Sequence, residues 1–98
     1  MNKYAPDLSS QFKDKTIIVT GSTQGSGAET AKLLAHRGAK GITICGRKEK
    51  EGLSIKEEIE KLGSQCVYVK ADLFEEKDCR NIVELTDKTF GRVDCLIN

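Results

Sequence analysis

Apolar and polar positions along the chain alternate in blocks that predict a regular succession of strands and helices. Residues 16–20 form a short β-branched run, which is typical of a parallel strand buried on both faces. Residues 26–37 follow with small and apolar side chains at helical spacing, and Gly38 supplies a left-handed stop. The side chains expected to face inward from this helix are Ala28, Ala31, Leu34 and Ala35.

The rest of the chain continues this alternation to a fourth strand. Residues 41–45 and 66–70 are predicted strands, residues 49–62 and 75–90 are predicted helices, and residues 93–97 form a last apolar run. Strands that alternate with helices predict an α/β fold with a Rossmann-like, doubly wound parallel sheet. The side chains expected to face inward from the second helix are Leu53, Ile55, Ile59 and Leu62.

A glycine-rich loop joins the first predicted strand to the first predicted helix. A phosphate has to approach backbone N–H groups closely, and glycine leaves room for it at a turn and at the head of a helix. The loop follows a strand and opens a helix, so it predicts a site for the pyrophosphate of a dinucleotide. The candidate contacts are Gly21, Ser22, Thr23, Gln24, Gly25, Ser26 and Gly27.

The end of the second predicted strand indicates which dinucleotide the loop would hold. NAD-binding domains place an Asp or Glu about twenty residues beyond the loop, whereas NADP-binding domains tend to supply Arg. This chain has Gly46, Arg47 and Lys48 there, so nothing repels a 2′-phosphate and Arg47 can bind it. We therefore expect NADP rather than NAD. The alternative is that Arg47 is only an exposed residue that opens a loop.

The charge balance and the hydropathy of the chain limit the kinds of molecule that it is expected to bind. Sixteen basic and fifteen acidic residues give a net charge of +1 without a long run of one sign. This balance offers no electrostatic footprint for nucleic acid or an anionic membrane. No segment approaches the roughly 18 apolar residues of a membrane span, and residues 1–10 lack the apolar core of a signal peptide. We expect a cytoplasmic protein with a small-molecule partner.

The chain has four cysteines, spread about evenly and without a Cys-x-x-Cys pair. Its only histidine, His36, has no second candidate ligand nearby in the sequence. We therefore expect no metal site and interpret the cysteines as reduced, mostly buried thiols. They are Cys45, Cys66, Cys79 and Cys95.

Three segments together resemble the short-chain dehydrogenase/reductase family: the glycine loop, residues 71–73, and residues 94–98. The resemblance implies that Asp72 holds the adenine amino group and that Leu73 offers its backbone N–H to the ring. It also implies that Asn98 lies against the ribose of the cofactor. In the expected strand order 3-2-1-4, Asn98 would lie beside Gly21. An Asp before a helix can also be only a cap or turn residue, so Asp72 has two interpretations.

The resemblance implies an NADP-dependent oxidoreductase, usually a homo-oligomer, that moves hydride between nicotinamide and a carbonyl or alcohol substrate. The serine and the Tyr-x-x-x-Lys pair of the family follow the fourth strand, and we place no catalytic residue in this chain. Tyr4 and Tyr68 have no Lys four residues on. A strand at the very end of the chain would leave an edge of the sheet that no further strand or helix covers. We therefore expect a polar leader over residues 1–15 and, over residues 16–98, the N-terminal part of the domain, truncated after its fourth strand.

Other function classes fit the sequence less well or stay open. A P-loop needs Lys and Ser or Thr after its last glycine, but here Gly27 is followed by Ala28 and Glu29. A methyltransferase that uses S-adenosylmethionine usually has an acidic residue where this chain has Arg47. Within the family motifs, Ser26 replaces an apolar residue, and Gln24 stands where many NADP-preferring members are basic. A non-catalytic module that holds a nucleotide or pairs with another subunit remains the alternative function.

Overall fold

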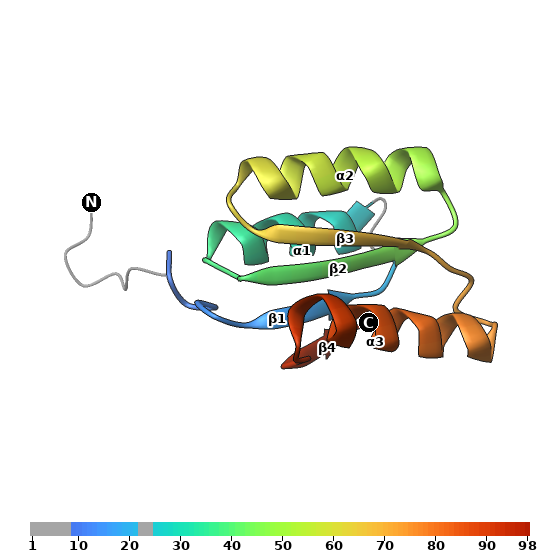
Figure 1. Ribbon diagram of the computed structural model, residues 1–98. Helices are drawn as coiled ribbons and strands as arrows, with labels where there is room; N and C mark the ends of the chain where they lie inside the picture. The colour runs from blue at the N-terminus through green and yellow to red at the C-terminus, as the bar shows by residue number, and fades with distance from the viewer. Residues whose placement is uncertain (1–8, 22–24) are drawn as a thin grey trace.

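The computed structural model describes residues 9–21 and 25–98 as a four-stranded parallel sheet with helices on both faces (Figure 1). The strand order is β3-β2-β1-β4, which confirms the predicted doubly wound α/β arrangement. Every predicted element is present, with bounds within two residues of those expected. The elements are β1 (Thr16–Val19), α1 (Gly25–His36), β2 (Gly41–Gly46), α2 (Glu49–Lys61), β3 (Gln65–Lys70), α3 (Glu76–Phe90) and β4 (Cys95–Ile97).

Two apolar layers hold the helices to the sheet, with α1 and α2 on one face and α3 on the other (Figure 1). Successive residues of a strand point to opposite faces. Ile17 and Val19 therefore pack toward α1 with Leu34, while Ile18 packs toward α3 with Ile82. All four residues of β1 are buried, which confirms the prediction of a strand covered on both sides.

The inward face of α1 is as predicted, but the predicted face of α2 was partly wrong. Ile59 is buried and Ile55 packs against the core, whereas Leu53 is 49% exposed and Leu62 is 36% exposed. Leu53 lies six residues before Ile59, which places it about 120° around the helix. Leu62 lies one residue beyond the end of α2. The buried face of α2 instead includes Gly52.

The prediction of mostly buried cysteines holds for only two of the four. Cys45 and Cys66 are buried, Cys79 is partly buried and Cys95 is exposed, and all four are free thiols. Cys95 lies on β4, the edge strand of the described sheet, and no described element covers its side chain. In the described part of the chain, no helix is both long and apolar enough to cross a membrane.

β4 is fastened to β1 at the start of the two strands. The backbone N–H of Thr16 donates to Oδ2 of Asp94 at 2.8 Å, and the backbone N–H of Asp94 donates back to the carbonyl of Thr16. The guanidinium of Arg92 also donates to Asp94. Hydrogen bonds from Arg92 and from the Thr16 N–H hold the pKa of Asp94 below its usual value, so the carboxylate stays charged at neutral pH.

Candidate cofactor-binding site

The two ends of the glycine loop adopt a backbone conformation that favours glycine. Gly21 has φ +60° and Gly25 has φ +63°. A Cβ built on either residue would have no atom within 4 Å, so open space lies beside both. A phosphate group could use this space to reach the backbone N–H groups. The predicted contacts Ser22, Thr23 and Gln24 lie outside the described residues.

The head of α1 is electrostatically suited to an anion. Gly25 is the first residue of α1, and Ser26 and Gly27 follow in the same turn. This turn carries no acidic side chain, whereas the first turns of α2 and α3 each carry two. A helix leaves its first N–H groups without partners inside the helix, and in the first turn of α1 no carboxylate offsets these groups or the positive end of the helix dipole.

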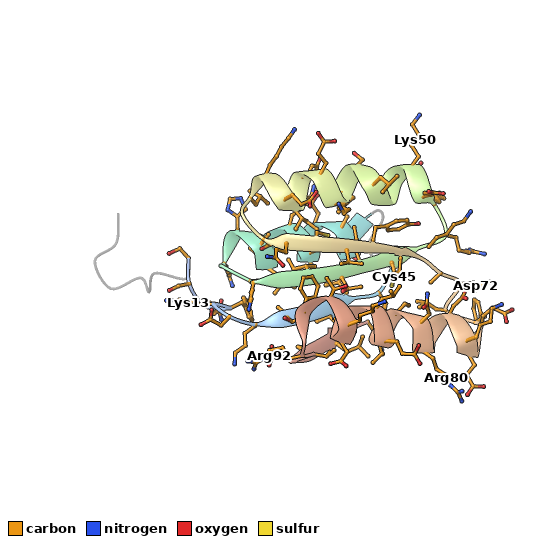
Figure 2. All side chains as sticks on the ribbon, in the orientation of Figure 1. Lys13, Cys45, Lys50, Asp72, Arg80 and Arg92 are labelled. Atoms are coloured by element: carbon orange, nitrogen blue, oxygen red, sulfur yellow. The ribbon has the colours of Figure 1, made fainter. Side chains whose placement is uncertain are left out.

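A depression of about 240 Å³ lies where β1, β2 and β3 end. Arg47 and Lys48 are exposed in the turn after β2, and Asp72 is half-buried in the turn after β3, where Figure 2 labels it. The depression thus brings together five of the predicted cofactor contacts from three loops. Its lining residues are Gly21, Gly46, Arg47, Lys48, Ala71, Asp72, Leu73 and Phe74.

Asp72 shapes the turn in which it lies. Its Oδ1 accepts a hydrogen bond from the N–H of Phe74 at 3.0 Å. This is the contact expected of a turn residue, and it uses one of the two carboxylate oxygens. Its own N–H donates to Oδ2 of Asp78 at 2.8 Å. Sequence reasoning missed Asp78, although its place as the third residue of α3 is where a capping box has its acidic residue. The carboxylate of Asp72 lines the depression and keeps further acceptor capacity for a ligand.

Asn98 lies on the other side of Leu73, in a second depression of about 240 Å³ that Leu73 also lines. The hydroxyl of Thr20 lies 3.0 Å from Oδ1 of Asn98, and the N–H of Thr20 donates to the carbonyl of Ile97 at 2.9 Å. Since Thr20 directly precedes Gly21, the structure places Asn98 beside the glycine turn, where the strand order predicts it.

The thiol of Cys45 lies beneath the glycine turn. Its Sγ is 3.8 Å from the carbonyl of Val19. Burial raises the pKa of the Cys45 thiol, and a hydrogen bond from the N–H of Gly21 opposes this shift only in part. The thiol is therefore protonated at neutral pH and packs below the turn. In the described part of the chain, no three His, Cys, Asp or Glu side chains gather in a way that could hold a metal ion.

Residues 15–98 match the model of a protein family described as short chain dehydrogenase. The chain belongs to the short chain dehydrogenase family. This confirms the resemblance inferred from the glycine loop and the segments after the third and fourth strands. The family implies a nicotinamide cofactor, NAD or NADP, and the open glycine turn, the unopposed head of α1 and the three-loop depression all fit such a group.

Two relatives of this chain are named as an oxidoreductase and a dehydrogenase. An uncharacterized oxidoreductase of Bacillus subtilis is 35% identical over 88 residues, which cover 90% of this chain and 24% of that protein. The mitochondrial (-)-isopiperitenol/(-)-carveol dehydrogenase of Mentha piperita is 38% identical over 82 residues, which cover 84% of this chain and 30% of that protein.

Solved structures of dehydrogenases share the fold. The apo form of glucose dehydrogenase from Caenorhabditis elegans superposes with a TM-score of 0.83 at 34% identity, over 90% of this chain and 38% of that one. Hydroxysteroid dehydrogenase from Escherichia coli superposes with a TM-score of 0.84 at 26% identity, over 89% of this chain and 35% of that one. The chain therefore spans between 24% and 38% of the length of these four proteins.

Proposed function

We propose that this chain is the cofactor-binding part of an NADP-dependent oxidoreductase that transfers hydride between nicotinamide and a carbonyl or alcohol carbon. The observation that carries the proposal is the depression that Gly21, Arg47 and Asp72 line from three strand ends. Ligands of doubly wound folds bind in the crevice outside the carboxyl ends of the strands, where this depression lies. Family membership supports the reaction class.

Each part of the dinucleotide has a candidate partner in this chain. The pyrophosphate would lie over the turn between Gly21 and Gly25, against the head of α1. Asp72 and Leu73 would hold the adenine, and Asn98 would lie against a ribose of the cofactor. Bound nicotinamide would supply or accept the hydride, while the residues of this chain bind and orient the cofactor.

The preference for NADP rests on the turn after β2. Arg47 and Lys48 are exposed there and line the depression, and they put two positive charges beside the adenosine position. Arg47 can meet a 2′-phosphate with two parallel charge-assisted hydrogen bonds. We extend the proposal to a cytoplasmic homo-oligomer with a small carbonyl or alcohol substrate, as the family resemblance and the balanced charge of the sequence suggest.

The replacement Arg47→Ala tests this function by calorimetric titration of the whole protein with NADPH and NADH. A charged hydrogen bond contributes about 1.5–3 kcal/mol, so NADPH affinity should fall about ten- to a hundredfold while NADH affinity hardly changes. Arg80→Ala is the matched control, since Arg80 is exposed on α3, pairs with Glu76 at 2.6 Å and does not line the depression. Equal losses for both cofactors in Arg47→Ala, or a comparable loss in Arg80→Ala, would refute the assignment.

A further inference from the structure

The carbonyl of Gly46, directly before Arg47, is held by two donors from β3 and the residue after it. The N–H of Ala71 donates to this oxygen at 3.1 Å and continues the hydrogen bonding between β2 and β3. The hydroxyl of Tyr68 donates to the same oxygen at 2.7 Å. One carbonyl has two lone pairs, and both are used here. These two hydrogen bonds therefore fix the orientation of the peptide group between Gly46 and Arg47.

The ring of Tyr68 also contacts the first turns of α2. In the sheet register Tyr68 pairs with Ile44, and its hydroxyl reaches the carbonyl of Gly46, two residues further along β2. A Cβ built on Gly52 would lie 2.2 Å from Cε1 of Tyr68, which shows that the ring fills the space a side chain would take. The N–H of Gly52 donates to the carbonyl of Lys48 at 2.9 Å. Tyr68 thus contacts the chain on both sides of Arg47 and Lys48.

We propose that Tyr68 is a positioning residue, which aims Arg47 and Lys48 at the 2′-phosphate of NADP through its contacts with Gly46 and Gly52. The inference rests on the proposed function. Tyr68 does not line the depression itself, so it acts through the segment it holds. Burial, reinforced by the nearby Glu49 carboxylate, raises the pKa of the Tyr68 hydroxyl, so this group remains a hydrogen-bond donor at neutral pH.

Cofactor selectivity distinguishes positioning from a general effect on the fold. NADPH and NADH differ only in the 2′-phosphate, so a change in the aim of Arg47 affects NADPH alone. Tyr68→Phe removes the hydroxyl and keeps the ring against Gly52. Loss of one neutral hydrogen bond should weaken NADPH binding about three- to tenfold, with NADH affinity changed by less than about twofold.

The experiment combines calorimetry with amide hydrogen exchange on the wild-type protein, Tyr68→Phe and a control. The control is Thr86→Val, which also removes a partnered hydroxyl: that of Thr86 lies 2.8 Å from Oγ1 of Thr43 and 2.7 Å from the carbonyl of Ile82. These contacts are in the layer between α3 and the sheet and not in the turn after β2. Exchange at the amides of Arg47 and Lys48 in the cofactor-free protein reports directly on how firmly Tyr68 holds the segment.

The expected result is a selective loss of NADPH affinity and faster exchange at residues 47–48 in Tyr68→Phe, with neither change in Thr86→Val. Equal losses for both cofactors, unchanged exchange at residues 47–48, or the same pattern in the control would overturn the inference. If the wild-type protein bound neither NADPH nor NADH, the proposed function would be refuted. The exchange comparison would then still decide whether Tyr68 holds the segment.

Discussion

Replacement of Gly25 by Ala separates the fit of the cofactor from the stability of the fold. Gly25 has φ +63°, and a Cβ built on it meets no atom within 4 Å. The variant therefore suffers no clash, and its cost is that of a left-handed backbone for a residue with a Cβ, about 1–2 kcal/mol. For a domain of this size each 1 kcal/mol lowers the melting temperature by about 4–8 °C.

This replacement should also weaken cofactor binding, an effect that is measured separately from its effect on stability. The new methyl group would stand at the head of α1, in the open space that we assign to the pyrophosphate. A phosphate displaced from even one N–H loses a charge-assisted hydrogen bond, so NADPH affinity should fall about tenfold or more. Thermal unfolding gives the change in stability, and calorimetric titration of the folded protein gives the change in affinity.

Gly91→Ala is the matched control for Gly25→Ala. Gly91 has φ +78°, has open space beside it and ends α3 at the opposite end of the sheet from the depression. Its replacement should lower the melting temperature by a similar amount and leave NADPH affinity unchanged. The reasoning is refuted if Gly25→Ala binds NADPH as tightly as the wild-type protein, or if the two variants lose affinity equally.

Two further predictions concern ionisation. Arg92 holds the pKa of Asp94 below its usual value, so the stability contributed by this carboxylate is present above about pH 4 and is lost as the pH falls through the folded pKa. Asp94→Asn should therefore lower the melting temperature at pH 7, and the difference from the wild-type protein should shrink in acid; equal melting temperatures at pH 7 would contradict this. Burial raises the pKa of Cys66 to about 12 and also raises that of Cys45. A maleimide should modify exposed Cys95 first, as followed by peptide mass spectrometry, and early modification of Cys66 would be the contrary result.

The fold was predictable because local patterns and global topology agree. The β-branched run of β1 and the small residues of α1 each specify their element and its buried face. The error at Leu53 arose because apolar residues of α2 were assigned inward without knowledge of its neighbours. The face that packs on the sheet includes Gly52, whose space is taken by the ring of Tyr68. That contact joins residues 16 positions apart and leaves no trace in helical periodicity.

The candidate site was predictable only where its residues lie in local motifs. Gly21 and Arg47 follow within two residues of strand ends, and in a parallel sheet the strand ends meet at one edge. Asp78 and Tyr68 were missed because their roles depend on which backbone group their side chains reach. The hydrogen bond from Tyr68 to Gly46 spans 22 residues, and in the sequence Tyr68 is marked only by its place within the predicted strand of residues 66–70.

The most direct test of the cofactor assignment is an NMR titration of the ¹⁵N-labelled protein with NADPH. The account predicts amide shift changes at Gly21, Arg47 and Asp72, which lie in the three loops around the depression. It predicts none at Gly38 and Gly91, which end α1 and α3 at the opposite end of the sheet. Shift changes confined to that opposite end, or none at any concentration of NADPH, would contradict it.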